Sequence, residues 1–203
     1  MSRDLRVCFL GDSFVAGTGD PEHLGWVGRL TARTHRGGSA LTAYNLGVRR
    51  QTSSQVLDRW LPECSPRLPE GCEGRVVVSF GVNDTTVENG RQRVSTAESA
   101  EHLTSLLRGV RAAGWTALVV GPPPVADQAH NLRTATLAEH LRAVAAKENT
   151  PYVATLSVLA RSPVWMAQVN AGDGAHPAAE GYTALADLLW PRWAAWLAAP
   201  ATS

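Results

Sequence analysis

Ser13 and His176 are the two residues of this chain whose types point most directly to nucleophilic chemistry. A serine hydroxyl becomes a useful nucleophile when a base accepts its proton, and histidine, with an ordinary pKa of about 6.5, suits that task. Asp173 precedes His176 by three residues, in the sequence Asp-Gly-Ala-His. A tight turn through the intervening glycine and alanine lets the carboxylate hold one ring nitrogen while the serine contacts the other. The residues are therefore candidates for a Ser-His-Asp triad, although each motif alone is also ordinary for a turn or a capped loop.

Acyl transfer also requires hydrogen-bond donors for the oxyanion, and Asn83 is a candidate for this role. It follows a predicted strand over 75–80, which contains the β-branched run Val76-Val77-Val78, and it carries a side-chain amide N–H. The loop after a second predicted strand, 41–47, supplies backbone N–H groups, and the backbone N–H of Ser13 is a third donor. Seen alone, Asn83 also fits a Gly-Val-Asn-Asp turn.

Apolar runs and helical periodicity alternate about five times along the chain, which predicts a parallel sheet covered by helices on both faces. The carboxyl ends of such strands share one edge of the sheet, so residues distant in sequence converge there. We expect Pro191 to kink or restart the last helix. We expect Trp190, Trp193 and Trp196 to pack that helix against the sheet. The predicted strands cover 7–10, 41–47, 75–80, 115–120 and 151–156, and the predicted helices begin near 25, 53, 95, 131 and 177, with an irregular stretch over 157–170.

Composition sets limits on the class of protein. The chain has 203 residues, 44% of them hydrophobic, and a formal net charge of +1, which predicts a single domain over 1–203 and gives no electrostatic case for nucleic-acid binding. No apolar run approaches the roughly 20 residues of a membrane span, and no export signal precedes the first strand, so we expect a cytoplasmic protein. Cys8 reads as a buried hydrophobe, and Cys64 and Cys72 as reduced thiols, with a disulfide between the latter two as the alternative. Oligomeric state stays open.

Four motifs in order resemble those of the SGNH hydrolases, the GDSL-type esterase and lipase superfamily. They are Gly11-Asp12-Ser13-Phe14, Asn45-Leu46-Gly47-Val48-Arg49-Arg50, Gly81-Val82-Asn83-Asp84 and Asp173-Gly174-Ala175-His176-Pro177. The resemblance implies a flavodoxin-like three-layer α/β/α sandwich with a five-stranded parallel sheet. It also implies metal-independent hydrolysis of a small-molecule carboxylic ester through an acyl-enzyme, without a cofactor.

One position departs from the family pattern. Many members carry glycine where this chain has Arg50, and that residue's backbone N–H serves the oxyanion. Arg50 keeps the role if it adopts the same backbone conformation, and Gly47 is the fallback donor. A guanidinium of Arg49 or Arg50 that faces the cleft would bind an anionic group on the substrate. The alternative is that both lie on the surface or pair with Asp58 or Asp84.

Other interpretations accompany this one. Val164, Trp165 and Met166 either line an acyl pocket or simply pack a loop onto the sheet. Asp173, His176 and Glu180 could hold a metal, but no further His or Cys cluster supplies ligands. The alternative functions are an acyltransferase on the same triad and a non-catalytic flavodoxin-like binding protein, although no Gly-x-Gly-x-x-Gly follows the first strand.

Overall fold

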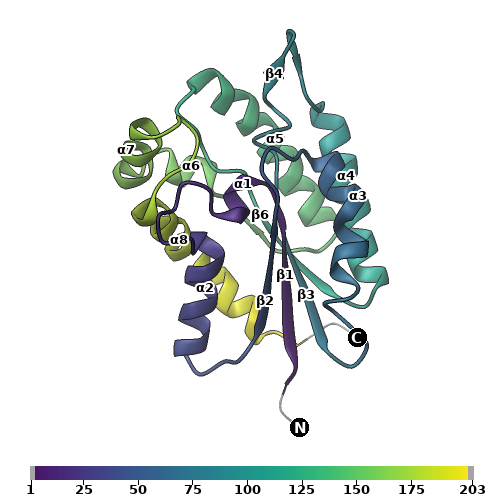
Figure 1. Ribbon diagram of the computed structural model, residues 1–203. Helices are drawn as coiled ribbons and strands as arrows, with labels where there is room; N and C mark the ends of the chain where they lie inside the picture. Colours follow the sequence, from purple (N-terminus) through teal and green to yellow (C-terminus); the bar gives the residue numbers. More distant parts are fainter. Residues whose placement is uncertain (1–2, 201–203) are drawn as a thin grey trace.

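The computed structural model describes residues 3–200, which form a five-stranded parallel sheet with helices on both faces (Figure 1). The strand order is β2-β1-β3-β6-β7, which is the flavodoxin-like order when the five strands are counted along the chain. From β1 the chain connects to β2 on one side, and from β2 it crosses back to β3 on the other side of β1. The carboxyl ends of β1 and β3 therefore flank the switch point at which α/β proteins bind their ligands. The strands are β1 (Leu5–Gly11), β2 (Thr42–Gly47), β3 (Glu73–Ser79), β6 (Thr116–Val120) and β7 (Tyr152–Val153).

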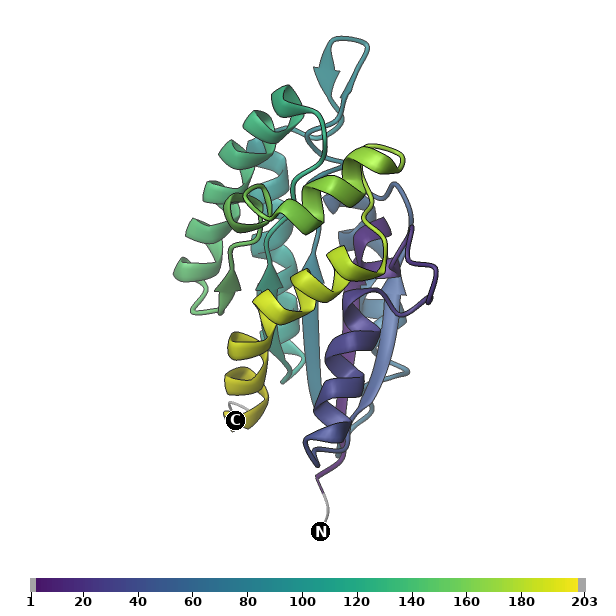
Figure 2. The same ribbon diagram turned by 90° about the vertical axis from the view of Figure 1, so that its left-hand side faces the viewer.

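Alternate residues of the central strands face two separate hydrophobic cores. Val7 and Phe9 of β1 contact the core under α2, α7 and α8, whereas Cys8 and Leu10 contact the core under α3, α4 and α5. This burial on both faces explains the unbroken apolar runs that predicted the strands. Figure 2 shows α2, α7 and α8 over one face. The helices are α1 (Ser13–Ala16), α2 (Gly25–Arg36), α3 (Ser53–Cys64), α4 (Thr96–Ala112), α5 (Gln128–Lys147), α6 (Leu156–Leu159), α7 (Pro163–Ala171) and α8 (Ala179–Ala198).

The segment before the Asp-Gly-Ala-His motif differs most from expectation. The predicted strand 151–156 is only the two residues of β7, and the stretch expected to be irregular forms α6 and α7. Ser162 caps α7 by accepting a hydrogen bond from the Trp165 N–H at 3.3 Å, and Pro163 occupies its first turn. Serine followed by proline is a helix-start signal, so this helix could have been predicted.

A small hairpin, β4 (Val87–Glu88) and β5 (Arg91–Gln92), was not predicted either. Its turn is Asn89-Gly90, and both residues have positive φ, at 52° and 76°. Such Asn-Gly turns favour two-residue hairpins. The hairpin projects beyond the carboxyl ends of the strands in Figure 1.

The last helix continues through Pro191 to Ala198, so the expected restart after Trp190 does not occur. Trp193 is fully buried and Trp196 nearly so, and the Trp193 ring lies 5.5 Å from that of Phe9, which confirms the packing interpretation for these two residues. Trp190 is half-buried, with the Arg33 guanidinium 4.1 Å from its ring centroid.

All three cysteines are free, so the alternative of a disulfide between Cys64 and Cys72 is wrong for this structure. Cys64 instead lies in the same core as Cys8, and its interaction with Cys8, together with burial, raises the pKa of the Cys64 thiol. Within residues 3–200, no helix combines the length and the apolar character needed to cross a bilayer.

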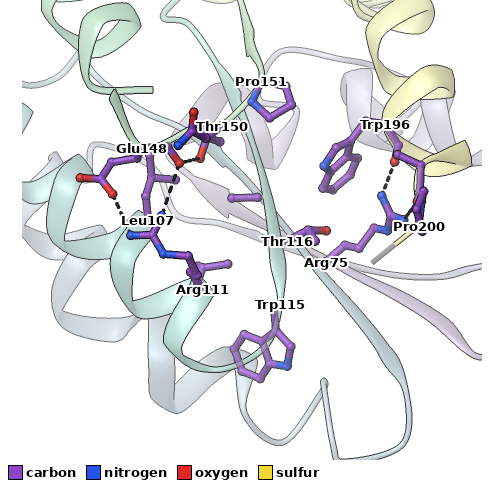
Figure 3. A pocket seen from close by; sticks show the side chains of 14 residues that line it. Arg75, Leu107, Arg111, Trp115, Thr116, Glu148, Thr150, Pro151, Trp196 and Pro200 are labelled. Carbon is purple, nitrogen blue, oxygen red and sulfur yellow. Dashed lines mark hydrogen bonds and ion pairs between the residues drawn. The ribbon is translucent and has the colours of Figure 1, made fainter. Parts of the chain in front are cut away.

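A cavity of about 190 Å³ lies near the amino ends of β3, β6 and β7, where it is closed by the end of α8 (Figure 3). Arg75 is buried beside it and donates hydrogen bonds to the carbonyls of Trp196 and Ala199, while Arg111 pairs with Glu148 at 2.9 Å. The two bonds of Arg75 bind the C-terminal end of α8 to the sheet at the edge opposite to Ser13, whereas the Arg111–Glu148 pair joins α4 to the end of α5.

Candidate active site

Ser13 lies at the junction of β1 and α1. β1 ends at Gly11, where any side chain would collide with the carbonyl of Ser79. Asp12 caps α1, because its Oδ1 accepts a hydrogen bond from the Phe14 N–H at 3.0 Å. The cap turns the chain sharply and makes Ser13 the first residue of the helix, with only 5% of its surface exposed.

His176 lies next to Ser13, and Asp173 lies next to His176. The His176 Nε2 is 2.7 Å from the Ser13 Oγ, and its Nδ1 is 2.7 Å from the Asp173 Oδ2. The turn between the acid and the histidine passes through Gly174, whose φ is 79°. The other oxygen of Asp173 accepts the N–H of Ala175 at 3.0 Å and that of His176 at 2.8 Å. The structure therefore brings together the three residues in the order that the sequence predicted.

The contacts of Asp173 determine its ionisation. Partial burial raises its pKa, but the hydrogen bonds from the backbone and imidazole of His176 and from the Ala175 N–H outweigh that effect and lower the pKa to about 2. The carboxylate is therefore charged near neutral pH, and it can hold a proton on the facing Nδ1 so that Nε2 is left to accept one from the serine.

Asn83 reaches the same edge of the sheet from the end of β3. Its Nδ2 donates to the carbonyl of Gln51 at 3.0 Å and to the Asp12 Oδ2 at 3.2 Å. Burial raises the pKa of Asp12 to about 7, against the hydrogen bonds from the Phe14 N–H and Asn83. The neighbouring Asp84 carboxylate raises that pKa further. Asp12 therefore joins the serine turn to the amide of Asn83, a role that the sequence reasoning missed.

Arg50 adopts the conformation that the sequence left open. Its φ is 65°, which costs a non-glycine residue on the order of 1 kcal/mol. Within residues 3–200 neither its backbone N–H nor that of Ser13 has a hydrogen-bond acceptor. The N–H of Gly47, the fallback donor, already donates to the Asn45 Oδ1 at 3.0 Å. Gly47 instead permits close packing, because a side chain there would collide with the backbone of Ala16.

The Arg50 side chain points away from any buried partner. It is 82% exposed, and its guanidinium lies 3.8 Å from Glu88 of the hairpin. Among the ion pairs of residues 3–200, Arg50 pairs with neither Asp58 nor Asp84. Asp84 is fully buried, and it accepts hydrogen bonds from the Ser53 N–H and the Ser99 hydroxyl, both at 2.8 Å. Asp84 thus secures the start of α3.

Trp165 does not line a cavity. Its ring is fully buried, its Nε1 donates to the Pro124 carbonyl at 3.0 Å, and its ring centroid lies 6.3 Å from that of Phe14. The Phe14 ring is in turn 4.9 Å from His176. Met166 is partly buried against the same core. These positions fit the alternative in which Trp165 and Met166 pack their segment onto the sheet.

A cleft of about 360 Å³ flanks the acid and the histidine, between α7 and the start of α8. Within residues 3–200, no three His, Cys, Asp or Glu side chains gather in a way that could hold a metal ion. Glu180, considered as a third ligand, accepts a hydrogen bond from Gln168 at 3.2 Å. The cleft is lined by Gly19, Gln168, Ala171, Gly172, Asp173, His176, Pro177 and Ala178.

Comparison with known proteins points to one family. A model of the GDSL-like Lipase/Acylhydrolase family matches residues 9–184. The lipase/acylhydrolase from Enterococcus faecalis has 22% identity and a TM-score of 0.74, over 93% of this chain and 94% of that one. The esterase EstA from Pseudoalteromonas sp. has 20% identity and a TM-score of 0.71, over 96% and 99%. The acetylxylan esterase Axe2 from Geobacillus stearothermophilus has 16% identity and a TM-score of 0.76, over 94% of each chain. No curated protein sequence shows significant similarity.

Proposed function

The chain belongs to the GDSL-like Lipase/Acylhydrolase family and is a carboxylic ester hydrolase, and we propose that Ser13, His176 and Asp173 are its catalytic triad. One observation carries the proposal: a contact of 2.7 Å joins the serine hydroxyl to the imidazole, and a second contact of 2.7 Å joins the imidazole to the carboxylate. This is the arrangement that serine acyl transfer needs.

The reaction follows from the positions of these groups. The Ser13 Oγ attacks the acyl carbonyl while the His176 Nε2 takes the hydroxyl proton, and Asp173 stabilises the imidazolium that forms. The imidazolium then gives that proton to the alkoxide oxygen of the leaving alcohol, which departs as the acyl-enzyme forms. His176 next removes a proton from water as that water attacks the acyl carbon. The imidazolium then gives this proton to the Ser13 Oγ, which leaves as the carboxylic acid is released.

We assign the oxyanion to three donors at the carboxyl ends of β1, β2 and β3. They are the backbone N–H of Ser13, the backbone N–H of Arg50 and the Nδ2 of Asn83. The two backbone groups lack acceptors within residues 3–200, so no bond has to break before they bind the oxyanion. Asn83 contacts Asp12 at a longer 3.2 Å, and we expect the oxyanion to displace that contact while the one to Gln51 persists.

The substrate we propose is a small-molecule carboxylic ester, and the acyl series in the first experiment measures which chain length it prefers. The family membership counts against the non-catalytic binding alternative. Transfer of the acyl group to an alcohol or sugar instead of water uses the same triad, and the test below includes it.

The first experiment measures the hydrolysis of p-nitrophenyl acetate and of longer acyl esters in the presence of a metal chelator. We expect Ser13→Ala to lower kcat by a factor of about 10³ or more, because the nucleophile is lost. The matched control is Ser39→Ala, since Ser39 is exposed in the loop after α2.

Comparable turnover by Ser13→Ala and the wild type would refute the triad. A folded wild type that releases p-nitrophenol only when an alcohol acceptor is added would support the acyltransferase instead.

A further inference from the structure

Arg93 is a charged residue near the site that the proposed mechanism does not use. It follows β5 at the base of the hairpin, and its side chain is only 19% exposed. Its Nη1 donates a hydrogen bond of 2.9 Å to the backbone carbonyl of Arg50. A charged guanidinium makes a stronger bond to a carbonyl than a neutral donor does. This bond therefore holds the residue whose backbone conformation is the least favourable in the proposed oxyanion site.

The backbone of Arg93 is itself held in place. Its N–H donates to the Thr86 carbonyl at 3.0 Å, and the N–H of Val94 donates to the Asp84 carbonyl at 3.1 Å. The hairpin thus begins shortly after Asn83 and Asp84, and its second strand brings the chain back beside Asp84. Its base is consequently fixed to the end of β3, and the Arg93 side chain spans from there to the loop after β2.

Three side chains from the segment 83–93 bind backbone groups between the end of β2 and the start of α3. Arg93 binds the Arg50 carbonyl, Asn83 binds the Gln51 carbonyl at 3.0 Å, and Asp84 binds the Ser53 N–H at 2.8 Å. A rotation of Arg50 to negative φ would change the angle between its own N–H and its carbonyl. Because the carbonyls of Arg50 and Gln51 are both held, such a rotation would turn the Arg50 N–H away from its present direction.

We propose that Arg93 is a positioning residue for ester hydrolysis, which keeps the strained Arg50 peptide in place so that its N–H meets the oxyanion. The inference rests on the proposed function, because it takes the Arg50 N–H as an oxyanion donor. Arg93 itself contacts neither the substrate nor the triad. Arg93 supplies a constraint that would be unnecessary if residue 50 were glycine, since glycine adopts positive φ without strain.

The test compares Arg93→Met, which keeps most of the buried stem, with Arg93→Lys, which keeps the charge. We expect Arg93→Met to lower kcat roughly tenfold with KM within about twofold, because the constraint affects oxyanion binding and not the uniform binding of substrate. Arg93→Lys should retain more of kcat, since an ammonium can still donate one bond. The matched control is Arg91→Met on the same hairpin, an exposed arginine with no hydrogen bond to Arg50.

A double-mutant cycle separates positioning from a merely structural role. In the Arg50→Gly background we expect Arg93→Met to cost less than about threefold in kcat, because the loop no longer depends on the guanidinium. An equal loss in both backgrounds, an unchanged kcat in Arg93→Met, or a rise in KM alone would each overturn the inference. Activity that survives in Ser13→Ala would refute the proposed triad instead, so the two failures are distinguishable.

Discussion

Two carboxylates near Ser13 differ sharply in ionisation: Asp12 directly precedes the serine, and Asp173 contacts its partner His176. Asp173 has a pKa of about 2 because hydrogen bonds from His176 and Ala175 outweigh its partial burial. Asp12 has a pKa of about 7 because burial dominates over the few donors it has. Residue type alone does not determine these pKa values, because they depend on how deeply each carboxylate is buried and on the N–H groups that reach it.

At the residue scale, this difference makes a prediction for the pH dependence of activity. Asp173 is expected to stay ionised from pH 5 to 9, so Asp173→Asn should lower kcat/KM by a factor of about 10³ at every pH in that range. The measurement is the pH profile of kcat/KM for both proteins, with Glu180→Gln as the control for loss of a nearby carboxylate. Convergence of the two profiles towards pH 5 would mean that Asp173 is already protonated there, and it would contradict the prediction.

At the scale of elements, α7 acts as a buried support for the histidine. Its Trp165 ring lies against Phe14, whose ring lies against His176. The helix therefore affects the site through packing, and a direct contact of Trp165 with an acyl chain would require the ring to leave the core.

Replacement of Trp165 tests this arrangement. Trp165→Ala should reduce the free energy of unfolding by about 3–5 kcal/mol, because it removes a fully buried ring and its hydrogen bond to Pro124. The relative rates on acetyl, butyryl and octanoyl esters should stay unchanged. Urea denaturation and the acyl series give the two readouts, and the half-buried Trp190→Ala is the control, with a smaller expected loss. A shift in chain-length preference at unchanged stability would favour the acyl-pocket role instead.

At the scale of the whole molecule, the sheet assembles the site from segments far apart in the chain. β1 pairs with both β2 and β3, so Ser13, Arg50 and Asn83 follow three adjacent strands. The loop before α8 then brings His176 to the same edge. A consequence of this assembly is that Asp12 becomes buried between the ends of β1 and β3, and its burial links folding to pH.

The sign of that linkage follows from the raised pKa. Between the ordinary aspartate pKa of about 3.9 and the value of about 7 in the folded protein, the native state holds a proton that the unfolded state lacks. The contribution of Asp12 to stability therefore falls as the pH rises through this window. We expect Asp12→Asn to gain stability relative to the wild type between pH 5 and 8, by more than about 1 kcal/mol.

Chemical denaturation at several pH values measures this difference. Asp58→Asn, at an exposed carboxylate on α3, is the control, and its free energy of unfolding should change with pH as that of the wild type does. If the free energy of unfolding of Asp12→Asn also followed the wild type at every pH, the burial of an ionisable Asp12 would have no effect on folding.

The sequence by itself determined the class of fold, the family motifs and the residues proposed for catalysis. Buried parallel strands are long apolar runs, and a motif such as Asp173-Gly174-Ala175-His176 is a local turn, so both are visible over a few residues. Ser162-Pro163 and Asn89-Gly90 carry equally local signals for α7 and the hairpin.

Tertiary structure alone decided the order of the strands and the surroundings of each side chain. The contact between Ser13 and His176 joins residues 163 positions apart, and the bond from Arg93 to the Arg50 carbonyl joins residues 43 positions apart. The positive φ of Arg50, the burial of Trp165 and the raised pKa of Asp12 likewise depend on neighbours supplied by other strands and helices. Such contacts follow from packing and solvent exclusion, which short-range propensities do not encode.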